Sequence, residues 1–425
     1  MYDVIVIGGG PAGLMASISA ASQGANVLLL DKGDKLGRKL AISGGGRCNV
    51  TNNKELDELI ENIPGNGRFL YSSFAVFNNR DIIRFFEGLG IRLKEEDRGR
   101  MFPVSNKAKD VVDALVCKVR ETGVEIRVLS PVDSLRFENG QVTGVRLRSG
   151  ELIDARNVIV AVGGKAVPHT GSTGDGYEWA RQAGHTITEL YPTEVPITLQ
   201  DEFIKKRLLQ GLSLRNIHLA VYNEKGKKKS EQEGDMIFTH FGISGPAALR
   251  CSQFVVKELQ KTDRPVVFMS IDLFPGQRAE QILNSIYAMA KHEPRKAIKN
   301  VLKGYVPERL VPILLDMAEL QADVTFAHLP KSPLEKLAQL LKRFPLQATG
   351  TLPIEEAFVT GGGVSLKEID PKTMQSKRMA GLFFCGEILD VHGYTGGYNI
   401  TAAFSTGYTA GKSAAERVSK EREPV

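Results

Sequence analysis

The stretch YDVIVIGGGPAGLMASISAASQGANVLLLD, residues 2–31, decides the fold class. The β-branched run 2–7 predicts a buried parallel strand, and the alanine-rich residues 14–23 predict a helix. Gly24 can end that helix, and residues 25–31 predict a second strand that ends in an acid. Strand, glycine loop, helix and strand follow one another, which is the order of a βαβ unit in an α/β protein.

The loop between the first strand and the helix, GGGPAG at 8–13, matches G-x-G-x-x-G. Gly8 allows a tight turn, Gly10 allows a pyrophosphate to approach the backbone, and Gly13 allows the helix to pack on the strand. The helix N-terminus adds N–H donors and a partial positive charge. Asp31 can accept hydrogen bonds from a ribose. The stretch therefore predicts dinucleotide binding, and the alternative is a purely structural glycine turn.

The composition limits the class of protein. The chain has 425 residues, of which 42% are hydrophobic and 24% charged, as in a soluble globular protein with two or three domains. The four cysteines lie far apart without a CxxC pair, so we expect a reducing, cytoplasmic location and no metal site. No apolar run approaches 18 residues, which argues against a membrane span. The strand predicted from residue 2 leaves no room for a signal peptide.

The net charge is mildly positive, with 55 Lys and Arg against 49 Asp and Glu. Basic clusters lie at 205–207 and 225–229. We interpret them as solvated surface and expect no nucleic-acid partner, because no aromatic residues interleave with them and no nucleic-acid motif is present. Nucleic-acid binding is the alternative interpretation.

In two later stretches, as at residues 2–8, a predicted strand is followed directly by glycine. Residues 125–163 predict a strand and a β-meander, with tight turns at Asn139-Gly140 and Ser149-Gly150 and a last buried strand, VIVAVGG. GLFFCGE, at 381–387, predicts another strand. HGYTGGYN, at 392–399, follows, and then a helix of small residues to about residue 411.

The G-x-G-x-x-G loop at 8–13, the central VIVAVGG and the C-terminal GLFFCGE together resemble the three-part signature of FAD proteins in the glutathione-reductase-like superfamily. Together with SGGGRCN (43–49), MIFTHFGISGPAAL (236–249) and FVTGGGV (358–364) they resemble one bacterial flavoprotein family. Its members are described as NAD(FAD)-utilising dehydrogenases or aminoacetone oxidase-like proteins, and some are linked to reduction of conjugated 3-oxo bile acids. The resemblance spans nearly the whole chain. It implies an α/β fold with a Rossmann FAD domain, built from a parallel sheet plus a β-meander, and an inserted β-rich and helical domain.

The resemblance also implies a set of FAD contacts. Asp31 would contact the adenosine ribose, Val132 the adenine through its backbone, and Glu387 the ribityl end. The predicted cofactor-binding residues are Gly8, Gly10, Pro11, Ala12, Gly13, Asp31, Lys32, Arg38, Lys39, Ser43, Gly44, Gly45, Gly46, Cys48, Asn49, Val132, Gly163, Gly386, Glu387, Gly397, Asn399 and Ile400.

The run SGGGRCN predicts a backbone cradle along the cofactor. Its glycines can adopt positive φ and turn N–H groups toward a ligand, while Arg47 and Asn49 offer side-chain donors. Disulfide reductases of the superfamily carry a CxxxxC pair at a similar position, but Cys48 has no such partner. A strained connection without a ligand, a chemical role for Cys48, and a long-range pair with Cys385 stay open as alternatives.

The pattern changes near Tyr191. We predict a first part of the FAD-binding domain at 1–190, a barrel-like β-rich insert at 191–275, a helical insert at 276–349, and the second part of the FAD-binding domain at 350–425. Since domain interfaces favour clefts, a substrate pocket between the insert and the flavin is expected.

The predicted function is an FAD-dependent oxidoreductase that transfers hydride between non-covalent FAD and a small organic substrate. No second G-x-G-x-x-G is present, so any NAD(P)H would bind transiently as the electron donor in the reduction of a conjugated carbonyl compound. His392 and Tyr394 are the candidate proton donors, with a structural role as the alternative. Three other hypotheses remain: an RNA-modifying flavoprotein, an amine oxidase that uses O₂, and an FAD sensor without turnover. The oligomeric state is left open.

Overall fold

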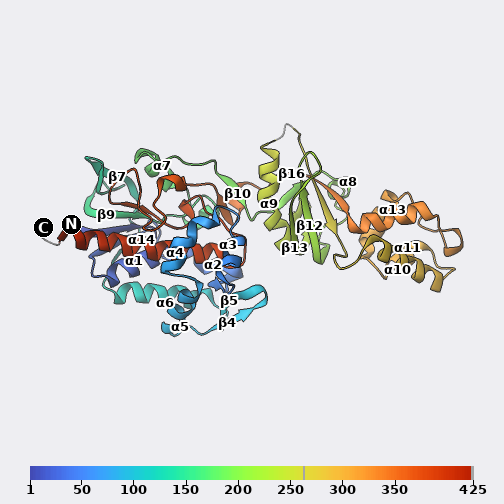
Figure 1. Cartoon of the computed structure of the whole chain (residues 1–425), viewed down its shortest axis with the longest axis horizontal. Helices are drawn as coiled ribbons and strands as arrows, with labels where there is room; N and C mark the ends of the chain where they lie inside the picture. The colour runs from blue at the N-terminus through green and yellow to red at the C-terminus, as the bar shows by residue number, and fades with distance from the viewer. Residues whose placement is uncertain (262–263, 423–425) are drawn as a thin grey trace. The chain divides into compact units, whose positions relative to one another are not determined.

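A computed structural model describes residues 1–261 and 264–422 of the chain. The chain folds into two compact units (Figure 1). Unit 1 comprises Met1–Tyr191 and Ile354–Val425, and unit 2 comprises Pro192–Pro353. Unit 2 is thus an insertion between the two parts of unit 1.

Unit 1 is built on a seven-stranded sheet with the order β6-β2-β1-β9-β8-β7, in which β18 also pairs with β9. β6, β2, β1, β9 and β18 run parallel, while β7, β8 and β9 form an antiparallel meander. The strands are β1 (Tyr2–Ile7), β2 (Val27–Leu30), β6 (Glu125–Arg127), β7 (Val132–Glu138), β8 (Gln141–Leu147), β9 (Leu152–Val160) and β18 (Leu382–Phe384). The predicted α/β class with a parallel sheet and a meander is confirmed.

The register of the sheet explains the apolar runs. Ile5 pairs with Leu28 on one side and Val158 on the other, and all three side chains are fully buried. Parallel strands covered on both faces need such continuous apolar sequence. In the meander, Asn139 and Gly140 both have positive φ, as a two-residue hairpin turn requires.

Two helices of small residues hold the ends of the chain together. α1 (Pro11–Ser22) packs along α14 (Tyr398–Arg422), which extends well beyond the predicted end near residue 411. An ideal Cβ at Gly407 would lie 2.3 Å from the Ala12 carbonyl oxygen, and one at Gly411 would lie 2.2 Å from that of Ala16. The two backbones therefore approach so closely that only glycine fits.

Unit 1 also contains two smaller sheets and further helices, and β10 begins at the last residue of its first part and continues into unit 2. A three-stranded antiparallel sheet has the order β3-β5-β4, and β10 pairs with β17. The elements are α2 (Arg38–Gly46), β3 (Thr51–Asn52), α3 (Leu56–Glu61), η1 (Gly67–Leu70), α4 (Tyr71–Val76), α5 (Asn79–Gly88), β4 (Leu93–Glu96), η2 (Asp97–Gly99), β5 (Arg100–Pro103), α6 (Ala108–Glu121), η3 (Pro168–Thr170), α7 (Asp175–Gln182), β10 (Tyr191–Thr193), η6 (Ile354–Glu356), β17 (Val359–Gly361), η7 (Leu366–Glu368) and η8 (Gly386–Ile388).

Unit 2 is a closed barrel with the strand order β11-β14-β13-β12-β15-β16, joined to a group of helices. Its strands are β11 (Ile197–Leu199), β12 (Ser213–Tyr222), β13 (Lys228–Phe238), β14 (Gly242–Ser244), β15 (Val267–Asp272) and β16 (Phe344–Thr351). Its helices are α8 (Glu202–Lys205), α9 (Pro246–Leu259), α10 (Ala279–His292), α11 (Ile298–Leu302), η4 (Glu308–Leu310), α12 (Val311–Met317), η5 (Phe326–His328) and α13 (Lys331–Lys342). Barrel and helices share one hydrophobic core.

The predicted helical segment 276–349 needs one correction. Its helices end at Lys342, and residues 344–349 belong to strand β16. β16 pairs with β15 on one side and β11 on the other, so it closes the barrel and leaves neither neighbour with an open edge. The period-two burial of Phe344, Leu346 and Ala348 marks the strand, but the preceding helical spacing obscured it.

Within the described residues, no helix combines the length and apolarity that crossing a bilayer requires.

The tight contact between α1 and α14 predicts the effect of a single methyl group. Gly411→Ala should lower the free energy of unfolding by about 1–3 kcal/mol, because the added Cβ overlaps the Ala16 carbonyl. Urea denaturation would measure this change. Gly88→Ala, in α5, is the matched control, since a Cβ there meets no atom within 4 Å and the helix gains up to about 1 kcal/mol. Equal stability of the two variants would contradict the packing argument.

Candidate cofactor site

The predicted dinucleotide loop lies between β1 and α1. Gly8 has φ +102°, and a Cβ there would lie 2.6 Å from the Ala161 carbonyl oxygen. A Cβ at Gly13 would lie 1.8 Å from the Gly8 oxygen, so helix and loop touch at this point. A Cβ at Gly10 would meet no atom within 4 Å, and Pro11 begins the helix without losing a needed donor. The loop therefore presents open space in front of the N–H groups of α1.

Asp31, at the end of β2, is fixed against this loop. One carboxylate oxygen accepts the Gly9 N–H at 2.7 Å, and the other accepts the Gly33 N–H at 2.7 Å. Each oxygen keeps a further lone pair. The carboxylate is therefore held in place and can still accept from a ribose hydroxyl.

The three basic residues predicted beside the cofactor all have acidic partners. Lys32 donates to Asp175 at 2.6 Å, and Arg38 pairs with an aspartate four residues before it. Lys39 donates to Glu387 at 2.5 Å and so links α2 to η8, although 348 positions separate the two residues. Of the three, Lys39 is the one that joins the N-terminal and C-terminal signatures.

The glycine cradle, Gly44–Gly46, has the predicted backbone. Its φ values are +57°, +68° and +82°, and a Cβ on either of the last two would meet no atom within 4 Å. Ser43 leaves the helical conformation just before it. Arg47, expected to offer donors here, instead pairs with Glu96 and stacks on Phe102, with its guanidinium carbon 4.3 Å from the ring centroid.

Cys48 is a buried free thiol. Burial raises its pKa to about 12, and a hydrogen bond with Ser43 opposes this only in part. Cys385 is also buried and free, so no disulfide joins the two residues. The thiol is therefore protonated at neutral pH, which argues against a nucleophilic role.

Asn49 supplies the clearest sign that this space takes a ligand. Its side-chain oxygen is buried and has no hydrogen-bond partner. A Cβ at Gly397, just before α14, would lie 3.0 Å from that oxygen and 2.8 Å from the Thr51 carbonyl. Because buried acceptors rarely stay unpaired, a bound group with an N–H or O–H donor is expected beside Asn49.

The C-terminal signature meets the dinucleotide loop directly. Gly386 has φ +78°, and a Cβ there would lie 2.8 Å from that of Ala12. Its N–H donates to Thr406 at 3.0 Å, and the second oxygen of Glu387 accepts from the Thr360 N–H at 2.8 Å. These contacts bring the glycine loop, the start of α14 and the Gly-Glu segment to one place.

The remaining predicted contacts surround this cluster or brace it. Val132 is buried at the start of β7, two residues after Ser130, whose N–H donates to the Asp31 carbonyl. Gly163 follows β9 with φ +74°. Asn399 bonds both the N–H and the carbonyl of Gly393, so its side chain braces the 393–394 loop; Ile400 lies half-buried in the first turn of α14.

His392 is buried and lies against the half-buried Tyr191, a contact that the sequence did not reveal. Its Nε2 is 2.9 Å from the Tyr191 hydroxyl, and its backbone pairs with Gly65 in an antiparallel bridge. A Cβ at Gly65 would lie 2.2 Å from the imidazole, so the ring rests on the glycine backbone. Burial and the nearby Asp390 raise the pKa of Tyr191. Tyr394 is also largely buried, in the same loop.

The site fits a dinucleotide with a donor-bearing ring system. The open glycine positions leave room for a phosphate chain, Asp31 keeps lone pairs for a ribose hydroxyl, and the Asn49 side-chain oxygen has no hydrogen-bond partner. In the described part of the chain, no group of three or more His, Cys, Asp and Glu residues is arranged to hold a metal ion.

Residues 2–413 match the family described as HI0933-like protein Rossmann domain. The chain belongs to this family. It is 33% identical over 409 residues to the ribosomal RNA dihydrouridine synthase of Escherichia coli, covering 96% of each chain. It is 31% identical over 423 residues to the 3-dehydro-bile acid delta(4,6)-reductase of Clostridium scindens, covering 98% of this chain and 100% of the relative.

Solved structures support the fold. The 3-ketosteroid delta1-dehydrogenase of Sterolibacterium denitrificans aligns with a TM-score of 0.52 at 14% identity, covering 98% of this chain and 99% of that one. The family match and the full-length relatives show that the chain is an enzyme of the FAD-dependent oxidoreductase class.

The raised pKa of Cys48 predicts its reactivity. At pH 8 the native protein should be alkylated by iodoacetamide at the exposed Cys117 and not at Cys48, because a thiol with a pKa of about 12 forms almost no thiolate at that pH. Peptide mass spectrometry would measure both sites, and denaturation in urea should make Cys48 reactive. Rapid modification of Cys48 in the native protein would contradict this prediction.

The contact between Gly386 and Ala12 predicts an effect on cofactor affinity. Gly386→Ala should weaken FAD binding by about tenfold or more, because the methyl group displaces the dinucleotide loop. Gly24→Ala is the matched control, since Gly24 also has positive φ but a Cβ there meets nothing. Fluorescence titration of the flavin-free proteins with FAD would compare the two, and equal affinities would remove Gly386 from the site.

Proposed function

We propose that the protein reduces a carbon–carbon double bond next to a carbonyl group. The names of the two full-length relatives favour this chemistry. Dihydrouridine is uridine reduced at the double bond conjugated with a ring carbonyl, and a delta(4,6)-reductase of a 3-dehydro-bile acid acts on double bonds conjugated with the 3-oxo group. One reaction type, hydride addition followed by protonation, covers both names.

Such a reduction needs a hydride at the carbon β to the carbonyl and a proton at the α carbon. FAD, when bound, would supply the hydride, and the residues of the glycine loop, the glycine cradle, Asp31, Asn49 and Glu387 would hold the cofactor. The protein itself must supply the proton and keep the substrate oriented.

The contact between the buried His392 and the half-buried Tyr191 is the observation that carries this proposal. The raised pKa of Tyr191 keeps the phenol neutral, so its oxygen can accept from the Nε2–H of His392 at 2.9 Å. The imidazolium form would carry its second proton on Nδ1 and could give it to a substrate carbon, which leaves a neutral imidazole for solvent to protonate again. We assign the proton donor to His392 and the positioning role to Tyr191. Tyr394, in the same loop, is the second candidate donor.

NAD(P)H is the proposed electron donor, binding transiently at the open face of the site. An anaerobic visible spectrum tests this step: the flavin bands should bleach on addition of NADH or NADPH. A spectrum that bleaches only with an amine or with dithionite, and recovers in air, would favour an oxidase. A flavin that resists all of these reductants would favour a sensor.

The assignment of His392 predicts a defect in one half-reaction. His392→Gln should slow the oxidation of the reduced enzyme by a 3-oxo-4-ene steroid or a uridine oligonucleotide by about 10²-fold, because the proton donor is lost. Reduction of the flavin by NAD(P)H should change little. Stopped-flow spectroscopy under anaerobic conditions separates the two steps.

Two variants serve as controls. His240→Gln removes an exposed histidine of unit 2 and should leave both half-reactions unchanged. Tyr191→Phe keeps the ring beside His392 and removes only the hydroxyl, so it should give a smaller defect with a shifted pH profile. Full activity of His392→Gln, together with a slow Tyr394→Phe, would move the proton donor to Tyr394.

A further inference from the structure

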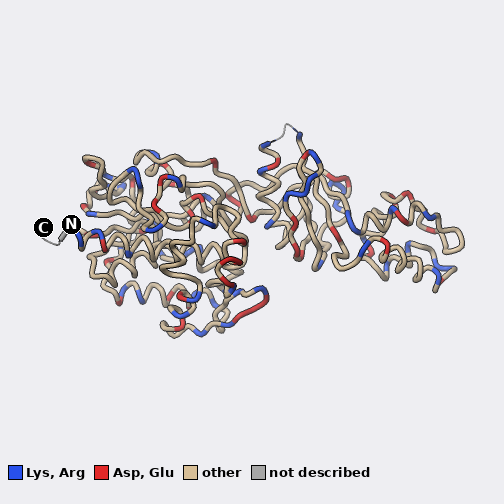
Figure 2. The backbone as a smooth tube through the Cα atoms, in the orientation of Figure 1, with Lys and Arg blue, Asp and Glu red and all other residues tan. Residues whose placement is uncertain are grey.

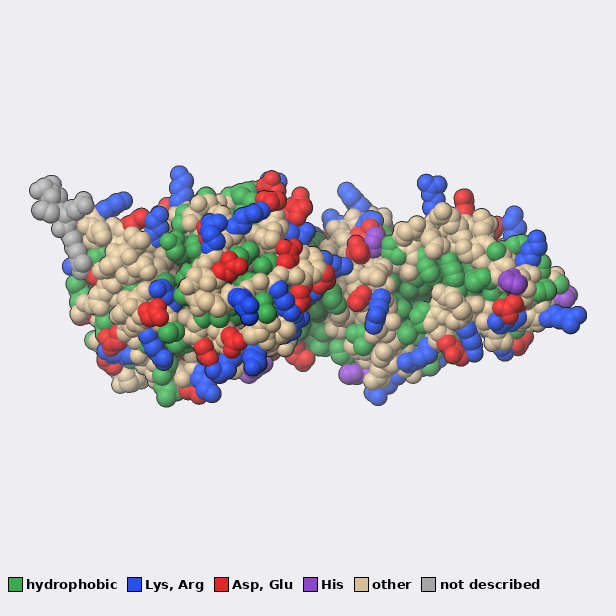
Figure 3. All heavy atoms as spheres, turned by 90° about the horizontal axis from the view of Figure 1, so that it is seen from below, with side chains coloured by type: hydrophobic (Ala, Val, Ile, Leu, Met, Phe, Trp, Pro, Cys, Tyr) green, Lys and Arg blue, Asp and Glu red, His purple; other side chains and the backbone are tan. Residues whose placement is uncertain are grey.

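The net positive charge of the chain lies entirely in unit 2. Unit 2 holds 23 Lys and Arg against 17 Asp and Glu, which leaves 32 of each kind in unit 1. On the face drawn in Figure 3, unit 1 carries basic and acidic side chains side by side. Figure 2 shows the positions of Lys and Arg in blue and of Asp and Glu in red along the backbone of unit 2. Unit 2 therefore has the electrostatic character of a module that meets a polyanion.

A lysine-rich turn between β12 and β13 is the most concentrated part of this charge. Lys225, Lys227 and Lys229 are exposed, and none of them forms an ion pair with any residue the structure describes. The turn is well ordered by hydrogen bonds, because the Asn223 side-chain oxygen accepts the N–H groups of Lys225 and Lys227 at 3.1 and 2.8 Å. The backbone of Lys225 and Lys227 is thus fixed, Lys229 lies in the second residue of β13, and none of the three ammonium groups has a local acidic partner within the described part of the chain.

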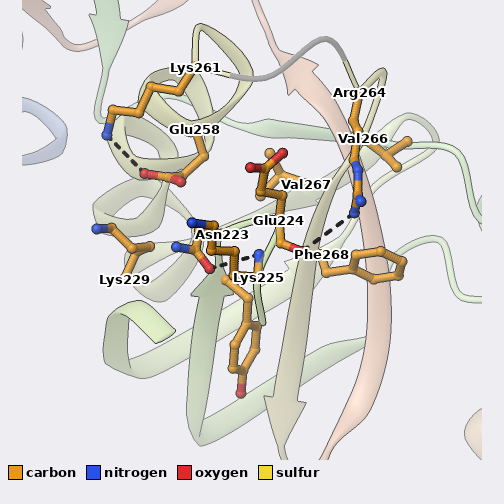
Figure 4. A pocket seen from close by; sticks show the side chains of 11 residues that line it. Asn223, Glu224, Lys225, Lys229, Glu258, Lys261, Arg264, Val266, Val267 and Phe268 are labelled. Carbon is orange, nitrogen blue, oxygen red and sulfur yellow. Dashed lines mark hydrogen bonds and ion pairs between the residues drawn. The ribbon is translucent and has the colours of Figure 1, made fainter. Parts of the chain in front are cut away.

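This turn borders a pocket at one end of the barrel (Figure 4). Lys229 and Lys261 lie on one side of the pocket, and Arg264 and Phe268 lie on the other. Two acids also line it; one of them, Glu258, is 3.0 Å from Lys261. The pocket therefore combines several cations with a few acceptors.

Aromatic side chains from two separate segments of the chain lie beside these cations. Phe268 on β15 is 49% exposed, which is unusual for a phenylalanine. Tyr222, at the end of β12, lines the same pocket; the Arg343 guanidinium carbon is 4.6 Å from its ring centroid. The fold thus brings Tyr222 and the lysine turn together with Arg264 and Phe268, which come from a later segment of the sequence.

We propose that this end of the barrel, formed by the lysine turn, Arg264 and Phe268, is a docking surface for single-stranded RNA. The proposal rests on the proposed function, since a uridine in RNA is one carrier of the double bond to be reduced. Phosphates would contact the unpaired lysines, and an unstacked base would lie on the exposed face of Phe268.

The mixed character of the pocket favours RNA over a membrane surface. The acids that line it can accept from ribose 2′-hydroxyl and base amino groups, which accompany the phosphates of RNA. A single exposed aromatic residue beside two carboxylates is a poor anchor for anionic lipid. A stacking surface on a rigid strand also suits a single strand better than a duplex, whose bases are already stacked.

Fluorescence anisotropy with a labelled 20-nucleotide single-stranded RNA tests the surface directly, using the whole flavin-loaded protein. Lys225→Gln, Lys227→Gln and Lys229→Gln together should weaken binding at least tenfold. They should also lower the slope of log affinity against log salt by about 2, which is 0.7 for each of three phosphate contacts. Phe268→Ala should weaken binding about fivefold or more without changing the salt slope.

The matched control removes the same charge elsewhere in unit 2. Lys291, Lys303 and Lys331, all on the helical part, would be replaced by Gln together. Near-normal RNA affinity of this control supports a local surface, and a loss equal to that of the turn variant overturns it. A wild-type protein that ignores the RNA, or that binds phosphatidylserine vesicles instead, also overturns it.

Failure of this inference is distinguishable from failure of the proposed function. Reduction of the flavin by NAD(P)H, and its reoxidation by a small 3-oxo-4-ene substrate, do not require the barrel surface. A protein that reduces such a substrate but does not bind RNA keeps the proposed reaction and loses the docking surface. A protein that binds RNA through the turn but reduces no conjugated substrate keeps the docking surface and loses the reaction.

Discussion

The site depends on one constraint: the backbones of α1 and α14, at the two ends of the chain, pack directly against each other with no side chain between them. α14 can reach α1 only because its glycines leave no Cβ against the carbonyls of Ala12 and Ala16. The same closeness places Gly386 against Ala12 and allows the ion pair between Lys39 and Glu387. Segments almost four hundred residues apart thus form one wall of the site, and any insertion between them must return the chain to this point.

The insertion of unit 2 is compatible with that constraint because the unit has its own core and a closed barrel. β16 completes the ring just before the chain returns to unit 1. A closed barrel leaves no strand edge for unit 1 to cover, so the unit requires no pairing to finish its fold. Its surface is therefore free to differ in charge from unit 1, and it does so: unit 1 is neutral while unit 2 carries the whole excess.

Much of unit 1 could be predicted from sequence because its determinants are local. The glycine loop, the acid at Asp31 and the positive φ of Gly44–Gly46 follow from residue type and spacing. The partners of Lys39 and His392 could not be predicted in this way. Glu387 and Tyr191 reach them only through the tertiary fold, and no periodicity records such contacts. Arg47 shows the same limit. It follows the glycine run in sequence, but its side chain forms an ion pair with Glu96 at the end of β4.

The role of Cys48 shows how packing decides chemistry that sequence leaves open. A cysteine beside three glycines could serve as a redox group, as a nucleophile or only as a packed side chain. Which of these roles it has depends on the surroundings of the thiol. The Cys48 side chain is fully buried, and this burial raises the pKa of the thiol. The hydrogen bond with the neutral Ser43 offsets that rise only in part, so the thiolate stays suppressed. The cradle is consequently a backbone device, which is why the proposed proton donor is His392, 2.9 Å from the Tyr191 hydroxyl, and not the thiol.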